Sequence, residues 1–245
     1  MNTHLIVQAR MNSSRLPGKV LKTVLGKTLL EYQLERLNQV ANADQIIVAT
    51  TIYPIDDSIV ELCDRLSIST YRGSEFDVLH RYANAAQIYD SLTIVRITSD
   101  CPLIDPALID RTIDFYRGNS FDYVSTDHTV YPRGMDVEIF SRDMLDTANH
   151  QALQPADREH VTPYFYQKPD LFSIGSYTEA IQASQYRLTV DTPEDFHLIQ
   201  VLLEKLYPNN PKFDLSHILK CLSENPEWTK INQHIPQKSL QEAGL

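Results

Sequence analysis

Three cations and two hydroxyl groups stand close together near the start of the chain. The segment 8–19 contains Arg10, Arg15 and Lys19 beside Ser13 and Ser14, and it directly follows the apolar residues 5–7, which are typical of a buried strand. Guanidinium and ammonium groups, together with backbone N–H groups around the serines, are what a loop needs to bind a polyanion. On these residues alone, a solvated basic loop is the simpler alternative.

This loop differs from the two common phosphate-binding motifs. A P-loop has two glycines with four residues between them, followed by Lys-Ser or Lys-Thr. Here Ser13 and Thr23 fall at the wrong distances from Gly18-Lys19. The dinucleotide motif G-x-G-x-x-G is also missing from this segment. Any phosphate binding here would therefore use the side-chain cations and the backbone N–H groups around the serines instead of either motif.

Two aspartates follow later predicted strands. Asp100 comes after the predicted strand 92–97, and Asp191 comes after the predicted strand 186–190. In an open α/β sheet, ligands bind at the carboxyl ends of the parallel strands, so we expect both aspartates to meet Arg10 at one edge. Because Mg²⁺ takes one or two carboxylates and fills its other positions with phosphate oxygens and water, the pattern indicates a metal–triphosphate site. A turn aspartate and a helix-capping aspartate are the alternatives.

The segments that must position these residues alternate between strands and helices. Strands are predicted at 5–9, 45–49, 69–71, 92–97, 121–125, 135–140 and 186–190. Helices are predicted at 28–40, 56–66, 77–89, from 105 onward, 142–150, 157–167, 192–206 and 214–222, with Pro163 kinking or ending the segment 157–167. This alternation predicts an α/β fold with a mainly parallel sheet.

Composition limits the protein class. The 245 residues suffice for one α/β domain, and without repeats or linkers we predict a single domain, 1–228, followed by a loosely held polar tail, 229–245. The net charge of −10 argues against a nucleic-acid partner. No apolar run approaches the roughly 20 residues of a membrane span. The three scattered cysteines, and the core strand that directly follows Met1-Asn2-Thr3-His4, lead us to expect a cytoplasmic protein without a signal peptide.

The first part of the chain resembles a known family. Its segment 7–37, with Arg10, Ser13, the run 15–19, Gly26-Lys27 and Leu30, is similar to the start of the cytidylyltransferases that make CMP-activated sugar acids, and within them to the branch named for the spore coat polysaccharide biosynthesis protein SpsF. The likeness continues to about residue 200. Asn12 stands where the family loop usually carries glycine, and because asparagine tolerates left-handed backbone we expect the loop to form.

The resemblance implies a fold, an activity and a nucleotide site. The fold would be Rossmann-like, with the mainly parallel sheet of nucleotide-diphospho-sugar transferases. The activity would be Mg²⁺-dependent transfer of CMP from CTP to a sugar acid for surface polysaccharide synthesis. The implied nucleotide-binding residues are Ala9, Arg10, Ser13, Arg15, Lys19, Gly73, Ser74 and Asp77. Since backbone groups read the base, the side chains alone leave cytosine, uracil and thymine open.

The resemblance also implies catalytic and metal-binding residues. The segment 100–104 is similar to the family's Asp-x-Pro-Leu-Ile motif, and the segment 191–195 to its Asp-x-Pro-Glu-Asp motif. Asp100 and Asp191 would then be the metal ligands, and Arg10, Lys19 and Asp100 the catalytic residues.

Two further segments, 131–138 and 157–164, match the SpsF-like branch and supply the implied acceptor-binding residues. These are Arg133, Glu138, Arg158 and His160. Arg133 or Arg158 would clamp the carboxylate of a sugar acid. An exposed charge pair is an equal alternative for Arg158, and a packed histidine for His160. Related enzymes are often dimers, so by analogy the stretch 127–136 could form an exchanged arm in a homodimer.

Three other functions remain open. The acceptor could be a sugar phosphate or polyol phosphate, which would give a CDP product. The protein could be a glycosyltransferase that uses a finished nucleotide sugar, although such enzymes commonly carry an Asp-x-Asp motif where this chain has Ser99-Asp100-Cys101. It could also be a catalytically silent binding subunit, against which the joint presence of Arg10, Lys19, Asp100 and Asp191 argues.

Overall fold

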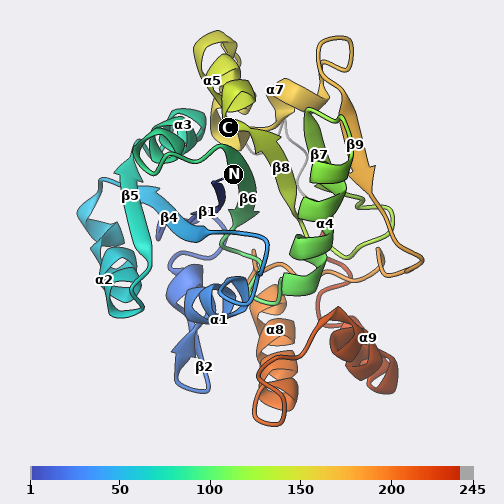
Figure 1. Ribbon diagram of the computed structural model, residues 1–245. Coiled ribbons are helices and arrows are strands. Elements are labelled where there is room, and N and C mark those ends of the chain that lie inside the picture. The colour runs from blue at the N-terminus through green and yellow to red at the C-terminus, as the bar shows by residue number, and fades with distance from the viewer. Residues whose placement is uncertain (1, 238–245) are drawn as a thin grey trace.

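A seven-stranded sheet of order β5-β4-β1-β6-β8-β7-β9 forms the centre of the computed structural model, which describes residues 2–237 (Figure 1). Its strands are β1 (Thr3–Gln8), β4 (Gln45–Thr51), β5 (Ser69–Gly73), β6 (Thr93–Thr98), β7 (Tyr123–Thr126), β8 (Glu138–Ser141) and β9 (Ile174–Tyr177). A separate hairpin pairs β2 (Thr23–Val24) with β3 (Lys27–Thr28). Within the seven-stranded sheet of residues 2–237, β5, β4, β1 and β6 run parallel, and only β8 runs antiparallel to its neighbours. The predicted α/β fold with a mainly parallel sheet is confirmed.

Helices cover both faces of the sheet (Figure 1). The longer ones are α1 (Leu29–Leu37), α2 (Asp57–Arg65), α3 (Val78–Ile88), α4 (Pro106–Gly118), α5 (Arg142–Gln151), α8 (Pro193–Leu206) and α9 (Leu215–Glu224). The short ones are η1 (Lys19–Leu21), η2 (Pro54–Asp56), α6 (Pro155–His160), α7 (Pro163–Tyr166) and α10 (Pro226–Thr229). Because side chains alternate along a strand, Leu5 and Val7 of β1 enter the core with α1, α4 and α8, whereas Ile6 enters the core with α3 and α5.

Capping side chains set where several helices begin. Thr28, Asp77 and Asp105 each accept a backbone hydrogen bond from the first turn of α1, α3 and α4, respectively. Thr192 forms a reciprocal capping box with Asp195 at the start of α8. These are the helix starts that the sequence predicts.

The order of the strands places a crevice beside β1. From β1 the chain moves outward to β4 and β5, then returns to the other side of β1 to form β6. In open α/β sheets, ligands bind at such a switch in strand order, outside the carboxyl ends of the strands. The loops after Gln8 and after Thr98 therefore face the expected site.

One predicted strand is wrong, and three strands were missed: β9 and the two short strands β2 and β3 of the hairpin. The segment 186–190 forms no strand: the N–H of Leu188 donates to Arg133 O, and that of Val190 donates to Asp100 O. Its apolar alternation reflects burial, but its donors bond to loop carbonyls instead of to a sheet partner. The edge strand β9 (Ile174–Tyr177) was not predicted, since it is short and carries Gly175.

The segment 157–167 divides at Pro163, as predicted: α6 ends at His160, and α7 begins at Pro163. Within the first part of the predicted tail, Asn232 packs against the domain. Asn232 is 2% exposed and donates to Arg187 O at 3.0 Å. Residues 238–245 of the predicted tail lie outside the described residues.

The segment 127–136, predicted as an exchanged arm, packs on its own chain. Tyr131 is buried, and the N–H of Ala183 donates to Val130 O.

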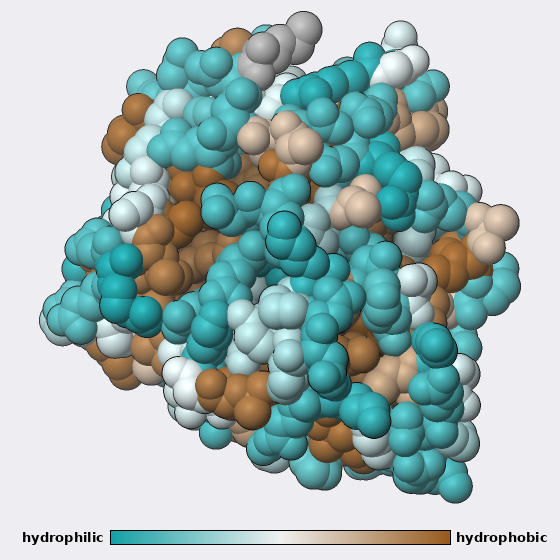
Figure 2. Space-filling model, turned by 60° about the horizontal axis from the view of Figure 1, so that its bottom comes forward, coloured by the Kyte–Doolittle hydropathy of each residue, from teal (hydrophilic) through white to brown (hydrophobic). Residues whose placement is uncertain are grey.

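Figure 2 shows a largely hydrophilic face on which apolar residues form separate patches. Among the helices within residues 2–237, none has the length and apolar character to cross a lipid bilayer.

Candidate active site

Hydrogen bonds to the backbone of Met11 hold the basic loop after β1 in a tight turn. The N–H of Met11 donates to Asp56 Oδ1 at 2.7 Å, and Met11 O accepts from the N–H groups of Ser13 and Gly18. Gly18 has a φ of +69°, a left-handed conformation that glycine adopts without strain. The turn leads directly into η1 and directs Lys19 back toward the sheet. The N–H of Ser13 is thus bonded within the loop itself.

Asn12 forms this loop without left-handed backbone. Within residues 2–237 it is absent from the non-glycine positions with positive φ. Its side-chain amide donates to Glu75 Oε1 at 3.2 Å, and Arg10 lies 3.5 Å from the same oxygen. Glu75 therefore ties the basic loop to the segment after β5.

Lys19 lies between the two predicted metal ligands. Its Nζ donates to Asp191 Oδ1 at 2.9 Å, to Asp100 Oδ2 at 3.3 Å and to Val190 O at 2.7 Å. The side chain is buried beneath the loop. Asp100 and Asp191 therefore converge on a single cation, which confirms that both carboxylates lie at one edge of the sheet.

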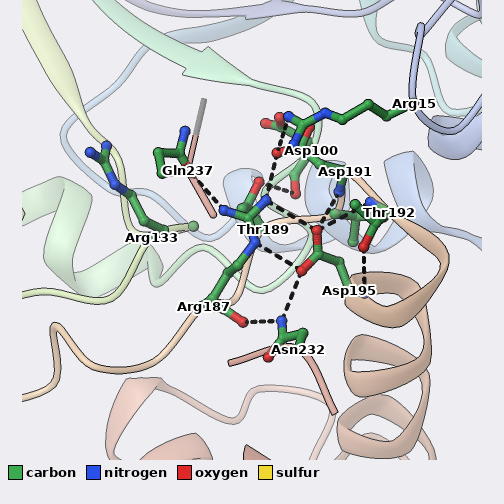
Figure 3. A network of polar contacts seen from close by, with 12 residues as sticks. Arg15, Asp100, Arg133, Arg187, Thr189, Asp191, Thr192, Asp195, Asn232 and Gln237 are labelled. Carbon is green, nitrogen blue, oxygen red and sulfur yellow. Dashed lines mark hydrogen bonds and ion pairs between the residues drawn. The ribbon is translucent and has the colours of Figure 1, made fainter. Parts of the chain in front are cut away.

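Asp191 is surrounded by cations from separate parts of the chain (Figure 3). Its Oδ2 lies 2.8 Å from a guanidinium nitrogen of Arg15 and 2.8 Å from one of Arg187. Arg187 also binds Asp195, which is fully buried, through Nε at 2.9 Å. Asn232 completes the network by donating to Asp195 Oδ1 at 2.8 Å. Asp191 is thus held in place by a buried hydrogen-bonded network and not by the end of a strand.

The ion pair between Asp100 and Lys19 keeps both of these groups ionised. Burial works against the charge of Asp100, but Lys19 and hydrogen bonds from Thr98 and Cys101 outweigh it and lower the pKa of Asp100 to about 2. Burial likewise opposes the charge of Lys19, yet Asp100 and Asp191 raise its pKa above the ordinary value. At neutral pH Asp100 is therefore anionic and Lys19 is cationic.

A polar cavity of about 240 Å³ lies above the carboxyl ends of β1 and β6. The predicted residues Ala9, Arg10, Ser13, Arg15, Lys19, Asp100, His160 and Asp191 all line it. Arg81 of α3 lines it as well and donates to Ser74 O at 2.6 Å. The basic loop and both carboxylates therefore face one cavity.

A second cavity of about 640 Å³ adjoins the first. Gln8, Arg15, Thr98, Asp100, His160 and Asp191 line both cavities. Arg133, Glu138, Tyr123 and Tyr166 belong only to the larger cavity, whose far wall is formed by β7, β8 and α7. The two cavities meet at Asp100 and Asp191, an arrangement that lets two different molecules reach the same pair of carboxylates.

Other predicted site residues lie outside the lining of both cavities. Gly73 and Ser74 are at the end of β5, where Ser74 Oγ accepts from the N–H of Asp77. Asp77 and Arg158, predicted to bind different ligands, bind each other at 2.5 Å. Arg158 also donates to Asn149 O, so its guanidinium joins α5, α6 and the start of α3.

Glu138 lines the larger cavity as part of a buried ion pair. Its carboxylate binds Arg96 and accepts from the Tyr123 hydroxyl at 2.6 Å. Arg96 also donates to Gln8 Oε1 at 3.1 Å. The Nε2 atom of His160 has no hydrogen-bond partner within residues 2–237, although it is buried. Burial lowers the pKa of His160, so its imidazole is neutral at pH 7.

Sequence reasoning missed three arginines at this site. Arg81 is buried on the face of α3 that also carries Val78 and Tyr82, and an arginine on an apolar helix face was the available signal. Arg96 and Arg187 alternate with apolar residues in segments read as strands. A charged residue at such a position indicates a buried partner.

Comparison with known proteins identifies the family. Residues 4–220 match the cytidylyltransferase family. The chain is 42% identical to an uncharacterised protein of Methanocaldococcus jannaschii, over 97% of both chains. It is 34% identical to the spore coat polysaccharide biosynthesis protein SpsF of Bacillus subtilis, over 91% of this chain and 94% of that protein. The resemblance to the SpsF-like branch is confirmed.

Solved structures agree with this result. A cytidylyltransferase from Leptospira borgpetersenii superposes with a TM-score of 0.90 at 31% identity, covering 98% of this chain and 100% of that one. A CMP-2-keto-3-deoxy-manno-octonic acid synthetase solved with CTP has a TM-score of 0.65 at 17% identity over 84% of this chain and 99% of that one, which shows the shared fold. The chain belongs to the cytidylyltransferase family.

Proposed function

We propose that this cytidylyltransferase transfers CMP from CTP to a sugar acid, with Mg²⁺ at Asp100 and Asp191, and so activates a sugar for surface polysaccharide synthesis. The observation that carries the proposal is the meeting of two cavities at Asp100 and Asp191. One cavity carries the basic loop that suits a triphosphate. The larger one has the volume and the mixed lining of an acceptor site.

The proposed reaction gives separate roles to the substrates and to the protein. An acceptor hydroxyl attacks the α-phosphorus of CTP, the bond between the α-phosphorus and the bridging oxygen breaks, pyrophosphate leaves and the hydroxyl proton passes to solvent. Little covalent work falls to the protein, which aligns the two substrates and stabilises charge. Arg10 and Arg15 face the smaller cavity, and with Lys19 they would hold the phosphates and stabilise the pyrophosphate.

The carboxylates fit a metal ion. One ammonium group already bridges Asp100 and Asp191, so both carboxylates converge on a single cationic position. Within residues 2–237, no group of three or more His, Cys, Asp or Glu side chains is arranged to hold a metal. The remaining ligands would therefore come from phosphate oxygens and water, as is usual for Mg²⁺. When bound, the metal would polarise the α-phosphate and favour deprotonation of the acceptor hydroxyl.

The larger cavity offers groups suited to a sugar acid. The Arg133 side chain is 39% exposed and shares its charge with Asp136 at 3.3 Å, so its guanidinium is accessible for a bidentate contact with a carboxylate. Tyr166 and Tyr123 provide apolar surface against which a sugar ring can pack, and their ring centroids are 6.2 Å apart. His160 lines both cavities and offers a neutral imidazole to a hydroxyl group.

The proposal is tested by pyrophosphate release in Mg²⁺ with CTP, UTP, dTTP, ATP and GTP, each against a panel of sugar acids and sugar phosphates. We expect release with CTP and a sugar acid, and a product whose mass equals that of a CMP-sugar. A CDP product from a sugar phosphate or polyol phosphate would replace the proposed acceptor class. Absence of turnover with CTP and every acceptor would refute the transfer reaction.

A further inference from the structure

The ammonium group of Lys19 has no donor left for a phosphate in the structure. An ammonium group has three N–H donors, and those of Lys19 point to Asp100, Asp191 and Val190 O at 3.3, 2.9 and 2.7 Å. The residue is only 9% exposed. Lys19 can therefore contact a nucleotide only after leaving at least one of these partners.

The oxygens of Asp191 are occupied in the same way. Oδ1 accepts from Lys19, and Oδ2 lies 2.8 Å from both Arg15 and Arg187. A metal ion needs lone pairs of the same oxygens. Metal binding at Asp191 therefore competes with the cations already bound there.

The charges of this cluster balance. The carboxylates of Asp100, Asp191 and Asp195 contribute three negative charges, and Lys19, Arg15 and Arg187 contribute three positive charges, so the net charge is zero. A dication that approaches the free protein meets a neutral cluster at a site of restricted solvent access. No net attraction offsets the cost of removing water from the ion.

The three cations differ in how firmly they are held. Arg187 is enclosed, with a side chain that is 8% exposed and further bonds to Asp195 and Gln237. Arg15 has a side chain that is 27% exposed and lines both cavities. Lys19 has a side chain that is 11% exposed, but it stands on the same loop and lines the smaller cavity, which Arg187 does not. A triphosphate in the smaller cavity would compete for Arg15 and Lys19, while Arg187 keeps its partners.

We infer that Lys19 and Arg15 occupy the metal-binding carboxylates of the free enzyme and exchange them for the triphosphate when the nucleotide binds, which opens the metal site. This inference rests on the proposed function, since it takes the metal and the nucleotide as ligands. It makes metal binding depend on the nucleotide. Lys19 then has two successive tasks: it neutralises Asp100 and Asp191, and afterwards it stabilises the phosphates.

The test is Mn²⁺ binding to the nucleotide-free protein, measured through the electron paramagnetic resonance signal of the Mn²⁺ that stays free. Wild-type protein is expected to bind Mn²⁺ weakly. The variant Lys19→Met removes one positive charge and frees the oxygens that it covered, so its Mn²⁺ affinity is expected to rise about tenfold or more. The double variant Lys19→Met/Asp191→Asn is expected to lose that gain, because one carboxylate is missing.

Lys22→Met is the matched control. It removes the same charge from the same segment, but the Lys22 ammonium lies over the Phe196 ring at 5.2 Å and outside the lining of both cavities. Its Mn²⁺ affinity is expected to equal that of the wild type. Arg15→Gln, at a more exposed position, provides a second variant if Lys19→Met does not fold, and a smaller gain in the same direction is expected.

Two results would overturn the inference. One is tight Mn²⁺ binding by wild-type protein without nucleotide, and the other is unchanged Mn²⁺ affinity in both folded Lys19→Met and Arg15→Gln. Calorimetric binding of CTP to the wild type and pyrophosphate release are measured alongside. If CTP binds and turns over while the variants show no gain, the exchange fails and the proposed function stands. If CTP neither binds nor reacts, the proposed function itself fails.

Discussion

Arg187 Nη2 lies 2.8 Å from Asp191 Oδ2, in an ion pair whose side chains are 8% and 12% exposed. The same guanidinium binds Asp195, so one arginine joins a carboxylate that faces the cavities to a fully buried carboxylate. A planar guanidinium with this fixed geometry holds both acids in one orientation. Arg187 is therefore a positioning residue for Asp191.

Replacing Arg187 should destabilise the fold. In Arg187→Met the buried carboxylate of Asp195 loses its cation, and breaking a buried pair in this way typically costs about 3–5 kcal/mol. Urea unfolding measures this loss. Arg111→Met is the control, because Arg111 pairs with Glu179 at the surface, where side chains are 43% and 35% exposed, and should change stability by about 1 kcal/mol or less. Equal losses in the two variants would contradict a buried positioning role for Arg187.

Removing the Lys19 side chain should slow the reaction strongly while the protein stays folded. Loss of one charge-stabilising donor commonly reduces turnover on the order of 10²-fold or more, and we expect this in Lys19→Ala. Pyrophosphate release gives the rate, and circular dichroism with thermal unfolding verifies the fold. Near-normal turnover would remove Lys19 from the reaction.

Arg133 should act on the acceptor alone. A hydrogen bond to a charged group contributes about 1.5–3 kcal/mol, so Arg133→Met should raise KM for a sugar-acid acceptor about tenfold to a hundredfold. The KM for CTP is the internal control and should stay constant, because Arg133 lines only the larger cavity. A rise in KM for CTP, with no change in KM for the acceptor, would show that Arg133 contacts the nucleotide and not the acceptor.

Gly134 should tolerate no side chain. Its φ is +100°, and a Cβ atom at this position would lie 2.5 Å from the backbone of Leu188. Gly134→Ala should therefore lose about 2 kcal/mol of stability or more, measured by thermal unfolding. Gly118→Ala serves as the comparison, since that helical position has open space around it and should be neutral or slightly stabilising. Comparable stability of the two variants would be inconsistent with the close approach of Gly134 to Leu188.

His4 should make the protein less stable in mild acid. Burial lowers the pKa of its imidazole below the ordinary 6.5, although Asp44 and Asp90 oppose the shift. Below about pH 6.5 the unfolded chain gains a proton that the folded imidazole does not accept, so stability is lost as pH falls through the depressed pKa. Urea midpoints measured between pH 7.5 and 5 should show this decline, and His4→Gln should make it smaller, leaving the part that comes from His160, whose pKa burial also lowers. An equal decline in urea midpoint for the wild type and His4→Gln would show that a group other than His4 causes the pH dependence.

The helix starts and the basic loop were predictable from local sequence. Thr28, Asp77 and Thr192 cap helices because a short polar side chain can accept bonds from the next turn, which is a property of neighbouring residues. Gly18 provides the left-handed turn before Lys19 for a similarly local reason. The apolar segments in the sequence likewise predicted the parallel strands around β1.

Other features depended on partners that sequence spacing does not reveal. The segment 186–190 alternates like a strand, but its donors reach the carbonyls of Arg133 and Asp100. Asp77 and Arg158, 81 residues apart, bind each other, and Asn232 reaches Asp195 from the polar end of the chain. Only packing brings such residues within hydrogen-bond distance.

By itself, the sequence determined the α/β class, the loop with Arg10 and Lys19, and the position of Asp100 after β6, because each depends on local pattern and on the shared direction of parallel strands. Only the tertiary structure decided that Lys19 lies between Asp100 and Asp191, that Arg187 fixes Asp191, and that two cavities meet there. The physical reason is that ion pairs and cavities form between segments far apart in the chain, where side-chain geometry determines which charges meet.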